Sequence, residues 1–402
     1  MKTVVFYLPY IGAGGTETLV MRLSQWSLSN GNRVVVLSRD PTTFKNVFNN
    51  LECYIYNNKK KTFITNDSHI ELTFLPSETV SVISFSLIDF LRCNDLLNKR
   101  YNCCFAHKLY IVHPNWSFFS KYTKWLNPLM VLLVKTKTIV FMDEETRDTC
   151  INRYKMKKYK TNIEILHIPM IIKNNILSKP KNQIINILTI SRFDFPFKAY
   201  ILGLIDIFGA LANTHKELSL TIIGGGKRGS VKELELVNKK INGLSKEIQE
   251  KIFLKGTIPY TELDAHIEGC DIFVGMGTTI LDAANMNKIC LVATSYQDGD
   301  LSLGFFYDNY KILGGIYDEK MTYFHLYDLI QQVISFDDKT FIERADITKK
   351  LLVENYDINK IAPKLISSNI FSFGERLELF AYRKMVSFYD FIRSRKNFKI
   401  IL

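Results

Sequence analysis

Short apolar runs alternate with amphipathic helical patterns along most of this 402-residue sequence, in two successive series. Apolar runs that each lead into a loop and then a helix predict parallel sheets covered by helices. In the first series the predicted strands are Thr3–Leu8, Arg33–Leu37, Val80–Phe85, Leu109–Val112, Thr138–Phe141 and Glu164–Ile168, with helices such as Thr16–Ser29 and Glu144–Tyr154. In the second series they are Ile185–Ile190, Leu218–Ile223, Ile252–Leu254, Asp271–Val274 and Ile289–Ala293. The sequence therefore predicts an α/β protein with two doubly wound domains in tandem.

A polar segment separates the two series. Residues 169–183 hold two prolines and lack clear periodicity, which is typical of a linker. We expect an N-terminal, acceptor-side Rossmann-like domain over residues 1–170, a linker over 171–184 and a C-terminal domain over 185–372. Residues 373–402 are expected to form a helix that crosses back to the N-terminal domain, with a second membrane-facing surface as the alternative. Ligands of such sheets bind beyond the carboxyl ends of the strands, so we expect a cleft between the domains.

The composition excludes several other classes of protein. Hydrophobic residues make up 47% and charged residues 23%, as in globular rather than disordered chains. The seven cysteines include no CxxC pair and no Cys/His cluster with zinc spacing, which fits a reducing cytoplasm. No run of 18 apolar residues is present. The N-terminal apolar run resembles a weak signal peptide, but an amphipathic helix follows at once, so we interpret it as a buried strand.

The net charge of +12 is concentrated in one region, because residues 98–160 hold 13 basic and 4 acidic residues. A basic face attracts phosphates, whether of nucleic acid, anionic lipid or a substrate. We find no RNP, zinc-finger or basic-zipper pattern, so nucleic acid is not an expected partner. Residues 113–128 interleave aromatic residues with lysines, which suits the inner surface of an anionic membrane. A core or lid helix, with lysines that only solvate it, is the alternative.

Glycine-rich turns follow two of the predicted strands. The turn Gly12-Ala-Gly14-Gly15-Thr16-Glu17 leads into a helix, and glycines there let a backbone approach an anion at the helix N-terminus. A dinucleotide fingerprint would need glycine at position 17, so a nicotinamide cofactor is disfavoured. A simple helix start capped by Thr16 is the alternative. The turn Gly224–Gly226 lacks P-loop spacing.

Two segments of the second domain carry groups suited to a nucleoside diphosphate. Arg192 and Lys198 follow a strand, and a guanidinium can fork onto two phosphate oxygens while an ammonium adds charge. The segment from Gly277 places threonine amides at a helix start, with Asp282 about one turn later, in reach of a ribose hydroxyl. A solvated loop and an acid favoured by the helix dipole are the structural alternatives.

In order and spacing, these segments resemble the GT-B glycosyltransferases of the large family 4 type, over most of the chain. The matching pieces are the GGxE turn at Gly14, Gly15 and Glu17, the SR…FK segment, the strand–GGG turn, Leu254-Lys-Gly256-Thr257 and the GTTILDAA helix start. The resemblance implies two Rossmann-like domains around an interdomain cleft. It also implies sugar transfer from a nucleotide-sugar donor to an acceptor with retention, without a metal or cofactor.

The resemblance implies a role for each matching residue. Arg192 and Lys198 would hold the donor diphosphate and offset charge on the leaving phosphate, and His113 would lie near the donor sugar, with a structural histidine as the alternative. The implied donor-binding residues are Gly14, Gly15, Gly224, Thr257, Ile258, Gly277, Thr278, Thr279 and Asp282. Asp282 stands where the family usually has glutamate on the ribose. The family's first acid, eight residues earlier, is replaced by Val274.

We therefore expect a cytoplasmic, peripheral membrane enzyme of bacterial surface-polysaccharide assembly, such as capsule or lipopolysaccharide, acting on a saccharide or lipid-linked saccharide acceptor. The missing acid supports one alternative, a degenerate GT-B protein that binds a nucleotide sugar or scaffolds a partner transferase. An epimerase of the same architecture would need an acid–base set that we do not find. Asp298 and Asp300 form an Asp-x-Asp pattern, but their position after the last core strand favours a loop over a metal site.

Overall fold

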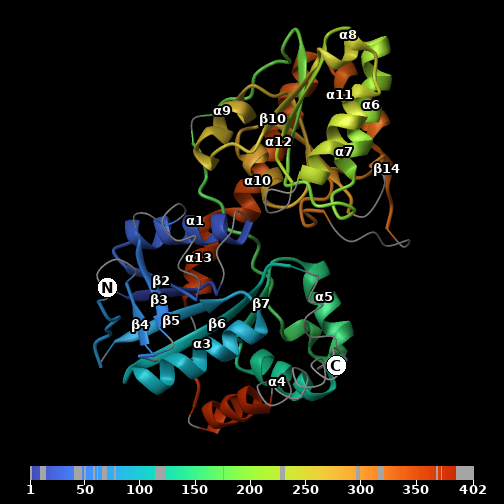
Figure 1. Cartoon of the computed structure of the whole chain (residues 1–402). Coiled ribbons are helices and arrows are strands. Elements are labelled where there is room, and N and C mark those ends of the chain that lie inside the picture. Colours follow the sequence, from blue (N-terminus) through green and yellow to red (C-terminus); the bar gives the residue numbers. More distant parts are fainter. Residues whose placement is uncertain are drawn as a thin grey trace, which may run out of the picture. The chain divides into compact units, whose positions relative to one another are not determined.

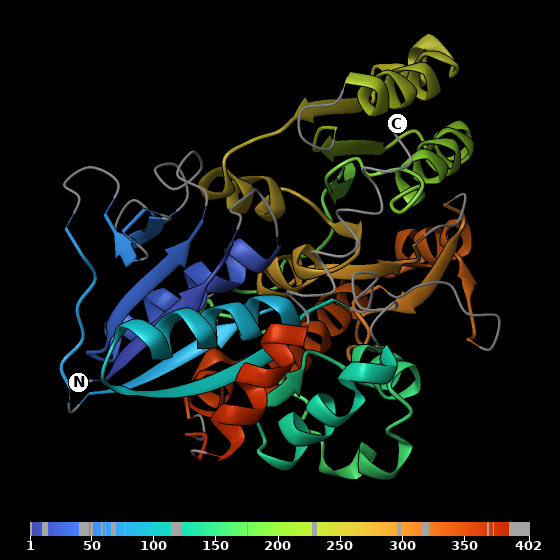
Figure 2. The same cartoon turned by 60° about the horizontal axis from the view of Figure 1, so that its bottom comes forward.

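The computed structural model divides the chain into two compact units (Figures 1 and 2), which are described one at a time. Unit 1 comprises residues 1–171 and 358–402, and unit 2 comprises residues 172–357. The structure describes residues 2–9, 15–39, 48, 51–57, 59–60, 62–65, 70–76, 78–113, 123–174, 176–226, 231–295, 299–314, 321–367, 370–372 and 374–385.

Unit 1 is built on a seven-stranded sheet of order β4-β3-β2-β1-β5-β6-β7. Its strands are β1 (Thr3–Tyr7), β2 (Arg33–Ser38), β3 (Glu52–Asn57), β4 (Thr62–Ile64), β5 (Thr79–Ser84), β6 (Cys104–Ile111) and β7 (Ile139–Phe141). Neighbouring strands are parallel except β3 and β4. The strand order reverses direction at β1 and β5, which makes this pair the topological switch point of the sheet.

Helices cover both faces of this sheet (Figure 1). They are α1 (Gly15–Ser29), α3 (Leu87–Arg100), α4 (Thr123–Lys135), α5 (Glu144–Arg153), the 3-10 turn η2 (Lys157–Asn162) and α13 (Ile358–Ile366). Helix α1 lies beside α13 on one face, and α3 packs on β5 and β6 on the other. The α3 sequence favours this helix, because Ser86 caps its N-terminus and Lys99 and Arg100 oppose the dipole at its end.

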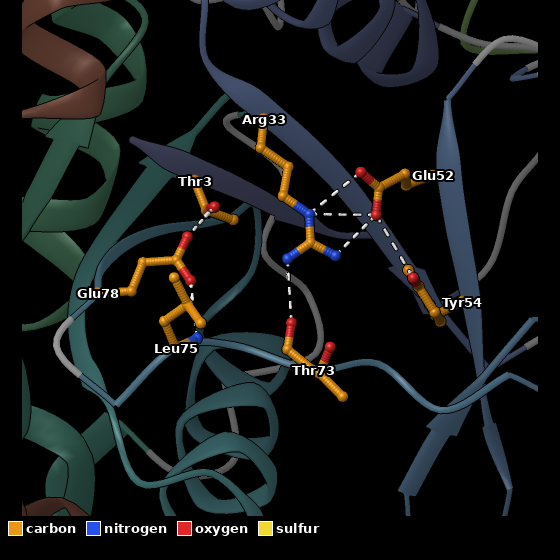
Figure 3. Close-up of polar contacts among 7 residues, drawn as sticks. All are labelled: Thr3, Arg33, Glu52, Tyr54, Thr73, Leu75 and Glu78. Carbon is orange, nitrogen blue, oxygen red and sulfur yellow. Dashed lines mark hydrogen bonds and ion pairs between the residues drawn. The ribbon is translucent and has the colours of Figure 1, made fainter. Parts of the chain in front are cut away.

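At the amino edge of the unit 1 sheet, polar side chains form a paired network (Figure 3). Arg33 forks onto Glu52 with its Nη2 atom 2.7 Å from Oε2, and its Nη1 atom donates to the Thr73 carbonyl oxygen at 3.0 Å. Glu78 accepts from the Thr3 hydroxyl and from the Leu75 amide. Hydrogen bonding to Glu52 raises the pKa of the Arg33 guanidinium. The network therefore ties the starts of four strands together through satisfied groups.

Unit 2 has a second seven-stranded sheet, of order β10-β9-β8-β11-β12-β13-β14. Its strands are β8 (Ile185–Ile190), β9 (Leu218–Ile223), β10 (Ile252–Gly256), β11 (Ile272–Gly275), β12 (Ile289–Ala293), β13 (Leu301–Phe305) and β14 (Phe324–His325). The first five are parallel, and β13 and β14 are antiparallel additions at one edge. This sheet switches direction between β8 and β11.

The helices of unit 2 form two layers around its sheet. They are α6 (Tyr200–Thr214), α7 (Val231–Asn242), α8 (Lys246–Gln249), the 3-10 turn η4 (Tyr260–Glu262), α9 (Leu263–Glu268), α10 (Thr278–Asn285), α11 (Leu326–Ser335) and α12 (Asp338–Tyr356). Helix α6 contacts α7, α8 and α11, whereas α10 contacts α9 and α12. The central strands are apolar and buried on both faces, as a doubly covered parallel sheet requires.

One predicted strand is wrong. Residues 164–168 form a single bridge, between Ile165 and Phe141, and no strand. The Leu166 amide does donate to the Phe141 carbonyl at 2.8 Å, so the segment runs beside β7 and buries Leu166 and Ile168 there. Its apolar pattern therefore reported burial, which a single bridge satisfies as well as a strand does.

The boundaries of the two units differ from the predicted domains. The predicted linker, residues 171–184, belongs almost entirely to unit 2 and is tied to it, since Asn182 bonds to Asp271 at 3.0 Å and Ser178 to Asp346 at 2.6 Å. The return to unit 1 begins at Ile358, earlier than the predicted 373, so the predicted domain end at 372 is wrong. A helix over residues 374–385 continues in unit 1, where Leu379 is buried.

Candidate functional site

The residues with predicted chemistry in the second domain gather at the carboxyl edge of the unit 2 sheet. At the switch point, β8 and β11 pair only through Leu188 with Phe273 and Ile187 with Ile272, so pairing stops before either strand ends. Connections that leave in opposite directions from such a pair open a crevice for a ligand. The Arg192 loop follows one strand of this pair, and the Gly277 turn follows the other.

The segment after β8 is held against the neighbouring glycine turn. The Phe193 amide donates to the Gly225 carbonyl at 2.8 Å, and Phe193 is fully buried. This anchor leaves Arg192 on the surface, with its side chain 47% exposed and its Nη2 atom 3.4 Å from an Asp194 carboxylate oxygen. The loop therefore presents a guanidinium to solvent at the mouth of the switch point.

Lys198 lies in a different environment, on the same segment. Its amide donates to the Asp194 carbonyl at 2.9 Å, just before α6 begins at Tyr200. Burial, followed by the charge of Arg192, lowers the pKa of the Lys198 ammonium to about 8. Two cations close enough to repel each other are poised for an anion that would relieve the repulsion.

The turn after β9 has glycine where a side chain cannot fit. Gly224 has φ of +152°, and a Cβ there would stand 1.8 Å from the Ser191 carbonyl oxygen. A Cβ on Gly225 would stand 2.6 Å from the Thr257 hydroxyl oxygen. The glycines therefore let the loops after β8, β9 and β10 pack together, and they bring exposed Thr257 and half-buried Ile258 to this edge.

The N-terminus of α10 supplies the opposite side of the switch point. Gly277 caps it with φ of +75°, and its amide donates to the Leu313 carbonyl. Thr278 and Thr279 are half-buried in the first turn, where helix amides lack acceptors within the helix. Asp282, one turn later, accepts from the Tyr260 hydroxyl at 3.4 Å. This end of α10 can therefore face an anion, with a carboxylate beside it for hydroxyl groups.

The departure at Val274 has a structural basis. Val274 lies inside β11, is fully buried and pairs with Leu291 of β12. The strand thus runs through the position where the family carries its first acid. A carboxylate there would lose its hydration among apolar side chains.

The predicted residues of the first domain belong to unit 1. His113 is exposed two residues after β6, at the carboxyl edge of that sheet, and Gly15 is the first residue of α1. Gly14 lies outside the described residues, as do residues 114–122 of the aromatic segment and Asp298. Asp300 lies 3.6 Å from the ring of His325.

Two residues at the unit 2 edge were missed by sequence reasoning. Tyr260 reaches Asp282 from the loop after β10, and Asp194 pairs with Arg192. Asp194 stood within the segment that carries Arg192 and Lys198, so its local signal was present. Tyr260 had none, because its partner lies 22 residues away in sequence.

Two general searches of the molecule were negative. The described residues contain no group of three or more His, Cys, Asp or Glu side chains that could hold a metal ion. Within the same part of the chain, no helix is both long and apolar enough to span a bilayer.

Comparison with solved structures relates this architecture to known proteins. A glycosyltransferase from Rickettsia africae ESF-5 is similar with a TM-score of 0.60 and 16% identity, over 90% of this chain and 96% of that one. Anabaena HepE in complex with UDP and glucose has a TM-score of 0.58 and 12% identity, over 91% and 98% of the two chains. TarM of S. aureus with fondaparinux, α-GlcNAc-glycerol and UDP has 0.58 and 12%, over 92% and 100%. No family model and no curated protein matches the sequence.

These likenesses span nearly the whole length of both chains. They establish the GT-B fold, with two Rossmann-like units and helices at the C-terminus, as the sequence predicted.

Proposed function

We propose that this chain is a glycosyltransferase that moves a sugar from a nucleotide-diphosphate donor to a saccharide acceptor. The observation that carries the proposal is the pair of cations on one side of the β8–β11 switch point and the α10 N-terminus on the other. Solved proteins of this fold that bind UDP, such as HepE and TarM, support a nucleotide sugar as the ligand.

The proposed chemistry is electrostatic, with retention of configuration and without a metal. Cleavage of the sugar–phosphate bond leaves negative charge on the outer phosphate. Arg192, Lys198 and the first amides of α10 are placed to hold that charge before it develops, and Asp282 would accept from the ribose. His113 would contact the donor sugar. Removing one preorganised donor of this kind typically costs ~10²–10³ in rate. The absence of a metal-ligand cluster among the described residues supports the use of protein cations instead.

We further propose a lipid-linked saccharide acceptor, and work at the inner face of a bacterial membrane in surface-polysaccharide assembly. The helix over residues 374–385 exposes Leu377, Phe380 and Met385. The ammonium groups of Lys99 and Lys384 lie 5.4 and 5.3 Å from the Phe380 ring centroid. Apolar side chains rimmed by lysines match an anionic bilayer surface. Flotation with anionic but not neutral vesicles, lost in Phe380→Ser, is expected; equal flotation of the variant would contradict this face.

The central test is a thermal-shift and hydrolysis screen of UDP, GDP and a panel of their sugars, with and without EDTA. One nucleotide sugar should stabilise the protein and be hydrolysed slowly, with no effect of EDTA. Arg192→Ala and Lys198→Ala should each abolish turnover, whereas Lys339→Ala, on a lysine side chain 84% exposed on α12, should not. Wild-type turnover in both site variants would refute the mechanism, and loss with EDTA would refute its independence of metal.

Burial of Val274 favours a second candidate, a GT-B protein that binds a nucleotide sugar or scaffolds a partner transferase. It predicts stabilisation by a nucleotide sugar without turnover, even when saccharide acceptors are supplied. The paired cations argue for the transferase, because a scaffold gains nothing from two cations that repel each other.

A further inference from the structure

The two edges of the unit 1 sheet differ in how their polar groups are paired. At the amino edge, Arg33 and its carboxylate neighbours satisfy one another (Figure 3). At the carboxyl edge, three buried polar atoms find no hydrogen-bond partner in the described part of the chain: the Tyr7 hydroxyl, the Ser84 hydroxyl and the Nε atom of Arg92. Buried polar groups are nearly always bonded, so a group of three without partners calls for a ligand.

Tyr7 and Ser84 are neighbours at the switch point of this sheet. They are the last residues of β1 and β5, and their Cα atoms pair directly in the parallel register. Tyr7 is 1% exposed and Ser84 is fully buried. Paired residues of parallel strands point to the same face. Here that is the α3 face, because Tyr7 packs in one core cluster with Cys93 of α3. The two hydroxyls therefore lie beneath the start of α3.

Helix α3 places two charged side chains beside them. Asp89 precedes Cys93 by one turn and accepts from the Ser86 hydroxyl at 2.5 Å. Arg92 stands with its Nη1 atom 3.9 Å from the other Asp89 oxygen, too far for a hydrogen bond, so Asp89 leaves the donors of this guanidinium largely unused.

A second guanidinium lies close to the same point. Exposed Arg39 directly follows β2, the other neighbour of β1. Burial raises the pKa of the Tyr7 phenol, and the positive charges of Arg39 and Arg92 act on it in the opposite direction. Burial likewise raises the pKa of Asp89, against the same two charges. Two guanidiniums and two hydroxyl donors thus face a single carboxylate.

We propose that Tyr7, Ser84 and Arg92 form a subsite that binds an oxyanion, a phosphate or a carboxylate, on the acceptor. The assignment to the acceptor rests on the proposed function, since the donor groups lie in unit 2. The donors outnumber the acceptors, and each oxygen of an oxyanion accepts several hydrogen bonds, most strongly from a guanidinium. A neutral sugar would leave the excess positive charge without a counterpart.

The test measures binding of inorganic phosphate, glucuronate and glucose to the full-length protein, by calorimetry and thermal shift, with the unit 2 site filled by UDP. Phosphate or glucuronate should bind and glucose should not, and which of the two anions binds tells phosphate from carboxylate. Tyr7→Phe, Ser84→Ala and Arg92→Gln should each weaken that binding about tenfold or more. Arg100→Gln, on the same helix and paired with Glu71 at 3.2 Å, should bind as the wild type does.

Stability of the ligand-free variants separates a ligand role from a structural one. Tyr7→Phe and Ser84→Ala remove hydroxyls without a partner, so their melting temperatures should stay level or rise. A clear fall in both would show that the hydroxyls are structural and would overturn the proposal. Equal binding of glucose would overturn it too, as would no binding of either anion, or anion binding that survives all three variants and is lost in Arg192→Gln.

The same titrations keep the two proposals distinct. UDP affinity should be unchanged by the unit 1 variants and reduced in Arg192→Gln. Anion binding at the unit 1 subsite without any nucleotide binding would support the subsite and refute the proposed transferase.

Discussion

The depressed pKa of Lys198 makes donor binding depend on pH in a defined direction. With a pKa of about 8, where an unperturbed lysine has 10.5, the ammonium is about 90% charged at pH 7 and about 10% charged at pH 9. The terminal phosphate of UDP, whose second pKa is near ~6, is ionised throughout this range. If the diphosphate binds the charged lysine, UDP affinity should fall about tenfold from pH 7 to pH 9, or ~1.4 kcal/mol.

Folding stability should change with the opposite sign. Between pH 8 and 10.5 the unfolded chain binds more protons at Lys198 than the folded chain does, so stability of the ligand-free protein rises with pH across this window. Binding and stability therefore diverge over the same range, which no general loss of folding can imitate.

Calorimetric titration with UDP at half-unit intervals from pH 6.5 to 9.5, beside thermal melts of the free protein, measures both effects. Lys198→Arg stays charged throughout and should bind UDP with little dependence on pH. Lys198→Gln, which avoids the larger side chain, should bind weakly at every pH. A wild-type affinity that does not change between pH 7 and 9, or an equal decline in Lys198→Arg, would refute the reasoning.

Three further changes test the packing. Gly224→Ala should cost ~2 kcal/mol more than Gly31→Ala in chemical denaturation, since a Cβ at Gly224 meets a carbonyl oxygen at 1.8 Å while Gly31, with φ of +72°, has open space; equal costs would contradict the clash. His107→Leu should flatten the stability–pH curve between pH 6.5 and 3, because burial lowers the pKa of His107 to about 3 and its protonation favours unfolding; an unchanged slope would exclude His107 as the cause. Val274→Glu should destabilise by ~3 kcal/mol or more and restore no turnover, and a gain in rate would reverse our interpretation of that position.

The central strands of both sheets could be predicted from the sequence, and the edge strands could not. Strands β8, β9 and β12 begin and end at the predicted residues, because they are buried on both faces and need continuous apolar runs. Strand β3 has five of its six residues exposed or half-buried and β14 is exposed, so neither leaves such a run. Edge strands pair on one side only, and their sequences carry less of the apolar signal.

The candidate site followed the same logic of local signals. Arg192, Gly224 and Gly277 stand at strand ends, where glycine and charge interrupt an apolar run, and the structure places all of them at one sheet edge. Their partners were not predictable, because the contact of Tyr260 with Asp282 depends on how separate loops fold over that edge.

The unit 1 subsite shows why such partners escape a reading of one segment at a time. Tyr7 and Ser84 each look like the ordinary end of a buried strand, and Arg92 like an ordinary surface position of an amphipathic helix. Their meaning comes from the parallel register that sets Tyr7 beside Ser84 across the switch point, 77 residues apart in the sequence. Strand order depends on contacts along the whole domain, so no local pattern encodes it. Hydroxyls that find no partner within the fold thus become visible only when the strands are assembled, and there they mark where the molecule is still incomplete without its ligand.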